Sequence, residues 1–261
     1  VFEMEDQRNW TDASYKTYCT PLGIPFPAEV QAGTQITQSM TVSLNGDVPG
    51  SDNGDKREQV VLSVNPVVSK PLPAVGVSAN TSELDESQVN ALQVMHLSHL
   101  RCDIHLSETA WEKGLERAVR QAAEIGVSLE IALYVSDAAS AEMASFVEAL
   151  AKHDACVVRF LVFHVAEVAI DKKWVQVARD ALAGFDVPIV SGANAYFTEL
   201  NRNHPPVDEL DGVCYSLNPQ VHAFDDASLM ETLIAQGWTV ESATHLSGNL
   251  PVHVSPVTLS P

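Results

Sequence analysis

The stretch HLRCDIHLSE, residues 99–108, has two different faces when it is read as a β-strand. Side chains of a strand point alternately to its two sides. The apolar side is formed by Leu100, Cys102, Ile104 and Leu106. The titratable side is formed by Arg101, Asp103 and His105. A strand of this kind, followed by a helical segment, predicts a barrel strand whose C-terminal end enters an active site.

Strands and helices alternate on both sides of this stretch. Between the strands lie segments with helical periodicity, such as the apolar stripe from Trp111 to Ile125, which Gly126 ends. We expect Ser82 to cap an earlier helix over 84–95. The segments of strand character are 75–80, 99–106, 128–135, 156–165, 187–194, 212–218 and 252–259.

This alternation predicts an α/β fold of the (β/α)8 TIM-barrel type. Seven strands are counted and no eighth precedes Pro261, so the barrel is expected to be incomplete at its C-terminus. A doubly wound open sheet is the alternative, but no glycine-rich phosphate loop follows the first strand. The segments WTVESAT and VHVSPVTL both have strand character. They are too close together for a parallel crossover, and we therefore assign only the second as a strand.

The first part of the chain has a different pattern. Residues 36–44 alternate between apolar and polar, and 59–66 is another short strand-like run, so 1–70 is predicted to be part of an antiparallel β-sandwich. Residues 71–261 are predicted to form the barrel domain. Because the chain begins at Val1 rather than Met, we expect a fragment or a trimmed chain.

Composition narrows the possible functions. The 261 residues are 46% hydrophobic, which suffices for a large core, and no apolar run is long enough to cross a bilayer. A net charge of −19 argues against a nucleic-acid partner. The four cysteines form no CxxC pair and are predicted to be buried thiols of a cytoplasmic protein.

Alternation along the predicted strands selects the side chains at the barrel mouth. Asp103 and His105 are interpreted as a general base and an oriented imidazole, or else as a hydrogen-bonded interior pair. Arg101, Glu130 and Arg159 are expected to form a buried ion-pair layer below them. The candidate substrate-binding residues are Asn80, Tyr134, His164, Asn194, Arg202, Asn218 and His222.

A second group of candidates follows the fifth barrel strand. Glu199, Asn201 and Arg202 place a carboxylate beside an amide and a guanidinium, which suits a sugar-acid site and makes Glu199 an alternative base. A capped turn with a surface salt bridge is the other interpretation. The three asparagines are predicted to bind hydroxyl groups of a polyol, although asparagine also suits turns at strand ends.

Neither a metal nor a cofactor is predicted. His105, His164, His222 and His253 fall near strand ends, but the sequence contains no HxH or HExxH motif. No GxSxG motif indicates a serine nucleophile.

Several long strings resemble the D-apionate lactonase family of branched-sugar catabolism. They are EMEDQRNWTDASYKTY (3–18), RCDIHLSE (101–108), YFTELNR (196–202), GVCYSLNPQVHAFDD (212–226) and PVHVSPVTL (251–259). The resemblance implies a bacterial hydrolase with a glycosidase-like TIM barrel that opens the lactone of a branched aldonic acid. It also implies that family members continue beyond residue 261.

Two other functions remain open at this point. A glycoside hydrolase would use two carboxylates, with Glu167 as one of them. A non-catalytic barrel would bind a sugar without turnover. The partner expected in each case is a small carbohydrate-derived molecule, a sugar lactone in the first hypothesis.

Overall fold

The computed structural model describes residues 4–6, 15–17, fifteen positions between 27 and 46, and residues 72–221 and 224–259. The chain divides into two compact units, Val1–Glu5 with Thr17–Pro73, and Asp6–Lys16 with Ala74–Pro261. In the N-terminal part, β1 (Met4–Asp6) and β2 (Tyr15–Thr17) form a two-stranded sheet. The strand predicted over 59–66 lies outside the described residues, and that over 36–44 does so in part, so the predicted N-terminal domain is not tested.

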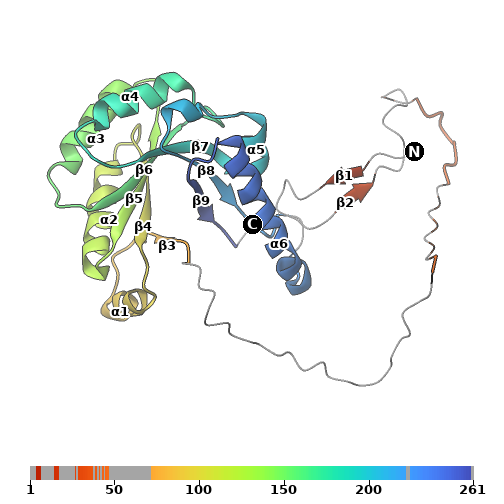
Figure 1. Cartoon of the computed structure of the whole chain (residues 1–261), viewed down its shortest axis with the longest axis horizontal. Coiled ribbons are helices and arrows are strands. Elements are labelled where there is room, and N and C mark those ends of the chain that lie inside the picture. The colour runs from red at the N-terminus through yellow and green to blue at the C-terminus, as the bar shows by residue number, and fades with distance from the viewer. Residues whose placement is uncertain are drawn as a thin grey trace. The chain divides into compact units, whose positions relative to one another are not determined.

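The second unit contains a parallel sheet of seven strands that curls into part of a barrel (Figure 1). Each strand pairs with the next in sequence, as predicted for the barrel, and the described sheet has β3 and β9 at its edges. The strands are β3 (Gly76–Ser78), β4 (His99–His105), β5 (Ser128–Val135), β6 (Val157–His164), β7 (Ile189–Tyr196), β8 (Gly212–Leu217) and β9 (Val252–Val257).

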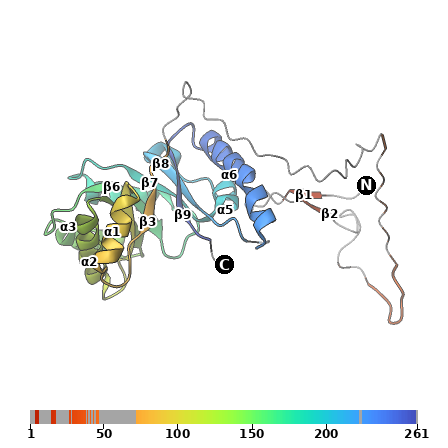
Figure 2. The ribbon, with the colours of Figure 1, turned by 90° about the horizontal axis from the view of Figure 1, so that it is seen from below.

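Helices follow the strands, and α2, α3 and α4 cover the outer face of the sheet (Figures 1 and 2). The predicted alternation is confirmed, and the polar connection after β7 begins with a short helix. The helices are α1 (Glu86–Val94), α2 (Trp111–Ile125), α3 (Ala139–Leu150), α4 (Lys172–Leu182), α5 (Phe197–Arg202) and α6 (Asp226–Leu246). Among the described residues, no helix is long and apolar enough to cross a membrane.

The two faces of β4 meet different surroundings, as the alternation predicts. Its apolar side chains join the large core between sheet and helices, in which Leu115, Met143 and Phe160 are fully buried. A smaller apolar cluster fills the inside of the curl and consists of Ala132, Tyr134, Leu161, Phe163, Val190 and Cys214. The polar side of β4 therefore lies on the concave face of the sheet.

The helix ends partly follow the predictions. Gly126 ends α2 with φ of +84°, a left-handed conformation that glycine adopts without steric cost. The prediction that Ser82 caps α1 is wrong. Asp85 is the cap: its carboxylate accepts a hydrogen bond from the Gln88 backbone nitrogen, and the Gln88 side-chain oxygen accepts one from the Asp85 backbone nitrogen.

The segment WTVESAT lies inside α6, which supports the choice of 252–259 as the seventh strand. Its β-branched residues fit a helix because the hydroxyls of Thr239 and Thr244 donate to carbonyls three or four residues earlier. Tyr215 of β8 also shares a 2.8 Å hydrogen bond with Thr239, which ties the helix to the sheet. Tertiary contacts thus outweigh local strand propensity.

The prediction of buried cysteines holds for Cys102 and Cys214 and is wrong for Cys156. Cys156 is exposed because it precedes β6 at the end of the sheet where that strand begins. All three are free thiols. Burial raises the pKa of both Cys102 and Cys214 to about 12, so these two thiols are unreactive at neutral pH.

Candidate functional site

Asp103 and Tyr134 meet on the concave face of the sheet, near the C-terminal ends of β4 and β5. The Tyr134 hydroxyl lies 3.0 Å from Asp103 Oδ1 and donates to it. Arg101, two residues before Asp103 on the same side of β4, donates from Nη2 to Oδ1 at 2.7 Å and from Nε to Oδ2 at 3.3 Å. The Asp103 carboxylate is therefore held from two directions.

The Asp103 carboxylate still has room for a further hydrogen bond. A carboxylate offers about four acceptor positions, and Arg101 and Tyr134 occupy three of them. The Asp103 side chain is 39% exposed, whereas that of Arg101 is only 6% exposed. Asp103 is thus the member of this group that water or a ligand reaches.

Asn194 and His105 complete the group at the barrel mouth. The Tyr134 hydroxyl shares its single proton between Asp103 Oδ1 and the Oδ1 of Asn194 of β7, which lies 3.3 Å away, and this leaves the Asn194 Nδ2 as a donor. The His105 ring stacks on the Tyr134 ring with 4.2 Å between centroids. Burial and the nearby Asp103 carboxylate raise the pKa of Tyr134, so its hydroxyl keeps its proton and acts as a donor.

Below this group lies the predicted layer of buried charges, and its main ion pair is confirmed. Arg159 Nε lies 2.5 Å from Glu130 Oε2, and Glu130 is 1% exposed. Ser255 of β9 bridges Glu130 and Arg101: it accepts from Arg101 Nη1 at 2.8 Å and donates to Glu130 Oε1 at 2.5 Å. The two arginines thus belong to one connected network.

Two histidines border this layer, and both have a lowered pKa. Burial lowers the pKa of His99, and Arg159 lowers it further while Glu130 opposes the change. Burial and Arg159 lower the pKa of His253 to about 4, so this imidazole is neutral at pH 7. Burial alone would raise the pKa of Glu130, but hydrogen bonds from Ser255 and Arg159 lower it below its usual value.

His99 is a member of this layer that the sequence analysis did not single out. Its Nε2 lies 3.4 Å from Arg159 Nη2 and 3.7 Å from Glu130 Oε2. Gly76 makes room for the ring, because a Cβ at that position would overlap the imidazole. The alternation that selects Arg101 also places His99 on the concave face, and this is the signal that identifies it.

Glu199 and Arg202 do not join this group within the described contacts. On α5, Arg202 Nη1 donates to Glu199 Oε1 at 2.9 Å, and Asn203 Nδ2 donates to Oε2 at 2.9 Å. The Glu199 carboxylate thus bridges its own helix and the residue that ends it. This geometry corresponds to the capped-turn interpretation of the segment.

His164 lies on the outer side of β6, away from the concave face. Its ring stacks on Trp174 of α4 with 4.6 Å between centroids. Its Nε2 is buried and has no hydrogen-bond partner among the described residues, and the nearest carboxylate oxygen, on Asp137, is 3.5 Å away. Its position follows from the strand alternation, because it shares a side of β6 with Phe160 and Val162, which pack in the outer core.

Glu167, the acid of the glycosidase hypothesis, is held by the start of α4. Its carboxylate accepts hydrogen bonds from Trp174 Nε1 and from the Asp171 backbone nitrogen, both at 2.9 Å. These bonds direct the carboxylate toward the helix, so the geometry gives no support to Glu167 as a general acid.

Asn80 and Asn218 both serve turns. The Oδ1 of Asn80 accepts from the backbone and hydroxyl of Ser82, and the Oδ1 of Asn218 accepts from the Gln220 backbone at 2.8 Å. Among the described contacts of the three predicted asparagines, the one between Asn194 and Tyr134 reaches the Asp103 group. His222 lies outside the described residues, and no group of three His, Cys, Asp or Glu side chains within the described part of the chain is arranged to hold a metal ion.

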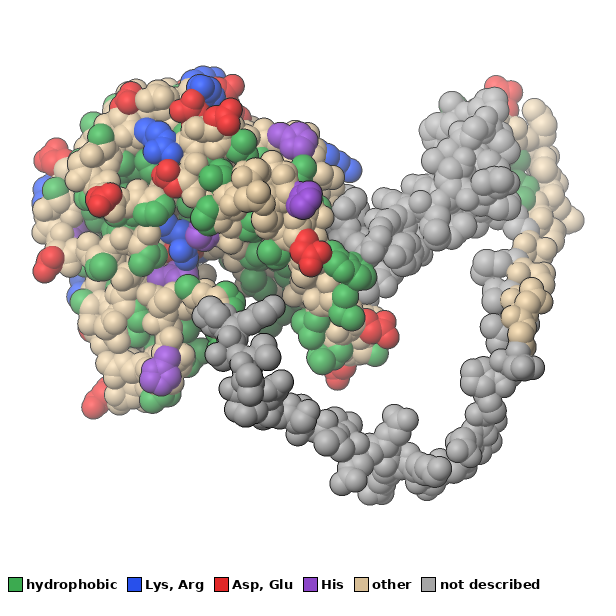
Figure 3. Space-filling view, viewed as in Figure 1, with side chains coloured by type: hydrophobic (Ala, Val, Ile, Leu, Met, Phe, Trp, Pro, Cys, Tyr) green, Lys and Arg blue, Asp and Glu red, His purple; other side chains and the backbone are tan. Residues whose placement is uncertain are grey.

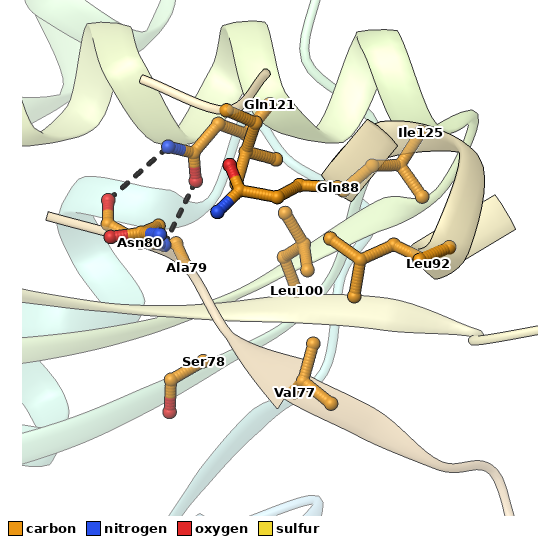
Figure 4. Close-up of a pocket in the computed structure, with 11 residues that line it drawn as sticks. Val77, Ser78, Ala79, Asn80, Gln88, Leu92, Leu100, Gln121 and Ile125 are labelled. Atoms are coloured by element: carbon orange, nitrogen blue, oxygen red, sulfur yellow. Dashed lines mark hydrogen bonds between the residues drawn. The ribbon is translucent and has the colours of Figure 1, made fainter. Parts of the chain in front are cut away.

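Two cavities lie near β4. One of about 340 Å³ is bordered by Asp103, His105 and Trp111 and by Lys113 and Arg117 of α2. Another of about 430 Å³ opens between β3, α1 and α2, where Val77, Leu92 and Leu100 form an apolar wall and Gln121 bonds to the Asn80 backbone (Figure 4). The first adjoins the Asp103 group and has room for a small sugar acid.

The visible surface of the barrel unit carries acidic side chains spread over its face rather than gathered in one patch (Figure 3). This distribution fits the net charge of −19.

Comparison with known proteins gives matches to the same family in both parts of the sequence. The family described as D-apionate lactonase, TIM barrel domain, matches residues 73–261, and the family described as D-apionate lactonase, N-terminal domain, matches residues 1–47. A D-apionate lactonase from Brucella anthropi is 30% identical over 281 residues. That alignment covers 99% of this chain and 45% of the relative, so the chain spans about half the length of this relative.

Solved structures resemble the chain in part. A β-glucuronidase from Ruminococcus gnavus in complex with D-glucaro-1,5-lactone has a TM-score of 0.46 and 11% identity, covering 70% of this chain and 34% of that one. A GH5 cellulase from an Icelandic hot spring isolate has a TM-score of 0.38 and 14% identity, covering 69% and 62% respectively. Likeness at this level carries no conclusion about function.

Proposed function

Because this chain belongs to the D-apionate lactonase family, we propose that it belongs to a cytoplasmic enzyme that hydrolyses a sugar-acid lactone of the D-apionolactone type. The observation that carries the proposal is the Asp103 carboxylate, which Arg101 and Tyr134 hold at the barrel mouth with one acceptor position open to solvent. The placement in the cytoplasm is supported by three free thiols among the described cysteines.

In the proposed reaction Asp103 acts as the general base. It takes a proton from a water molecule while the water oxygen bonds to the lactone carbonyl carbon, and the carbonyl oxygen becomes an oxyanion. When this intermediate collapses, the bond between the carbonyl carbon and the ring oxygen breaks. The leaving ring oxygen takes the proton back from Asp103, and the product is an open hydroxy acid.

Asn194 and His105 are proposed to stabilise the oxyanion. The Tyr134 hydroxyl bonds to Asn194 Oδ1, so the Asn194 Nδ2 group remains available to donate to the oxyanion. His105 is oriented by its stacking on the Tyr134 ring. Such preorganised donors act most strongly where water is excluded, and each is worth about 10²- to 10³-fold in rate in enzymes of this kind.

Asp103 is preferred to Glu199 as the base on geometric grounds. Glu199 pairs with Arg202 of α5 and with Asn203, which ends that helix, and no described contact links its carboxylate to Tyr134, Asn194 or His105. Asp103 contacts Tyr134 directly and is linked to Asn194 through the Tyr134 hydroxyl.

The function is tested by a pH-stat assay of the protein against a panel of aldonolactones and aryl glycosides. Lactone opening releases one proton at neutral pH because the acid formed ionises, whereas glycoside cleavage releases the aryl group. We expect turnover of lactones with branched or five-membered rings and none of aryl glycosides. Cleavage of aryl glycosides without lactone turnover, or binding without any turnover, would contradict the proposal.

A further inference from the structure

The hydroxyl of Ser255 lies between two buried charged groups that come from distant parts of the chain. Arg101 on β4 and Glu130 on β5 are 154 and 125 residues from Ser255 in sequence, and both contact its Oγ. The hydroxyl accepts a hydrogen bond from the guanidinium and donates one to the carboxylate. A hydroxyl is a side-chain group that does both at once, so it suits a position between a cation and an anion.

Each of the three nitrogen atoms of the Arg101 guanidinium donates a hydrogen bond in this arrangement. Its Nε and Nη2 hold the two oxygens of Asp103, its Nη2 also reaches the Tyr134 hydroxyl at 3.3 Å, and its Nη1 holds Ser255. A guanidinium is planar and its donors are fixed relative to one another. The bond to Ser255 therefore helps to fix the plane of the Arg101 guanidinium and the direction of its hydrogen bonds to Asp103.

Arg101 lies between two carboxylates, and Ser255 separates it from one of them. Glu130 is 1% exposed and attracts Arg101, but its Oε1 is already occupied by the Ser255 hydroxyl. Without that hydroxyl, Arg101 Nη1 would lose its acceptor and the guanidinium would turn toward Glu130. Such a rotation would weaken the hydrogen bonds from Arg101 to Asp103.

We propose that Ser255 is a positioning residue of the lactonase site: it holds the Arg101 guanidinium in the orientation that aims the Asp103 carboxylate at the substrate. This inference rests on the proposed function, in which Asp103 is the base. Ser255 is half-buried and directs its hydroxyl to Arg101 and Glu130, so in this proposal it acts through Arg101 rather than by touching the substrate. Loss of the Ser255 hydroxyl is therefore expected to lower the rate of the chemical step rather than to weaken ground-state binding of the substrate.

The test compares Ser255→Ala with Ser255→Thr, which keeps the hydroxyl. Ser191→Ala is the control, because Ser191 is a buried serine of the same sheet whose hydroxyl donates to the Val162 carbonyl, outside the network. Asp103→Asn is measured in parallel. The readouts are kcat and KM for an aldonolactone, together with a 13C NMR titration of the Glu130 carboxyl group.

We expect Ser255→Ala to lower kcat by about tenfold to a hundredfold with little change in KM, as is typical of a small displacement of a catalytic group. Ser255→Thr should restore most of the rate, and Ser191→Ala should retain it. The pKa of Glu130 should rise in Ser255→Ala, because one of the hydrogen bonds that lowers it is gone, and should stay unchanged in Ser191→Ala.

The inference is overturned if folded Ser255→Ala keeps the wild-type kcat while Asp103→Asn is inactive, since the base would then not need Ser255. If instead Asp103→Asn is fully active, the proposed base is wrong, and the Glu130 titration alone still shows whether the network exists. Should Ser255→Ala fail to fold, Ser255→Cys replaces it, because a thiol of similar size is a weak donor and acceptor. A wild-type kcat in that variant also overturns the inference.

Discussion

The imidazole ring of His105 lies parallel to the phenol ring of Tyr134, with 4.2 Å between the ring centroids and 8° between the planes. The two residues are also partners in the register of β4 and β5, so neighbouring positions of a parallel sheet bring them together. Tyr134 thereby orients His105 through its ring and Asp103 through its hydroxyl. The two roles of Tyr134 can be separated experimentally.

Tyr134→Phe keeps the ring and removes the hydroxyl. We expect kcat for lactone hydrolysis to fall about tenfold or more, because a hydrogen bond to a charged group is worth roughly 1.5–3 kcal/mol. Tyr215→Phe is the matched control, since Tyr215 is also a buried tyrosine of the sheet but its hydroxyl bonds to Thr239 of α6. It should lose about 1 kcal/mol of stability in urea unfolding and keep kcat. Equal kcat in Tyr134→Phe and the wild type would remove Tyr134 from the site.

The buried ion pair of Glu130 and Arg159 is expected to matter strongly for stability. Arg159→Met leaves the buried Glu130 without its main counter-charge and should lower the free energy of unfolding by about 3–5 kcal/mol. Lys152→Met is the control, because Lys152 and Glu148 pair at the surface with side chains 66% and 79% exposed. It should change the free energy by less than about 0.5 kcal/mol. Similar small losses in both variants would contradict a buried pair.

His253 should make the protein less stable in mild acid. Its pKa is lowered to about 4 in the folded protein from 6.5, so between these values the unfolded chain binds the proton that the folded one excludes. The free energy of unfolding should therefore fall as the pH drops from about 6.5 to 4, by about 2 kcal/mol after allowance for partial exposure. Urea unfolding at several pH values measures this slope. His253→Gln should flatten it, whereas replacing the exposed His204 by Gln should not.

Gly76 is expected to be required by the ring of His99. Gly76→Ala places a Cβ within the volume of the imidazole and should destabilise the protein by about 1–3 kcal/mol through overpacking. Gly184→Ala, at a position where an added Cβ meets nothing within 4 Å, should be neutral or slightly stabilising. Thermal unfolding of both variants gives the comparison. A Gly76→Ala protein as stable as the wild type would mean that His99 lies elsewhere.

The sequence alone predicts the parallel strands, their order and the two faces of β4, because these follow from short-range periodicity. It also predicts the ion pair of Glu130 and Arg159, since strand alternation puts both on the concave face. The same rule applies to His164, whose parity places it against α4.

The remaining site could not be predicted because it depends on which side chains bond across the sheet. Nothing in the local pattern indicates that Asn194 faces Tyr134 while Asn80 and Asn218 serve turns. Likewise, the choice of Asp103 over Glu199 as the base depends on knowing that Glu199 bonds to Arg202 and Asn203. The contact that brings Asn194 into the site joins it to Tyr134, which is 60 positions away in the sequence.

In the proposed reaction, Asp103 is the base that activates water for lactone opening. The most direct test is the initial rate of aldonolactone hydrolysis at pH 7 by Asp103→Asn, with Glu199→Gln as the matched carboxylate variant. We predict a loss of at least about 10²-fold for Asp103→Asn and a rate near that of the wild type for Glu199→Gln. The opposite pattern, or a wild-type rate in Asp103→Asn, would contradict the account.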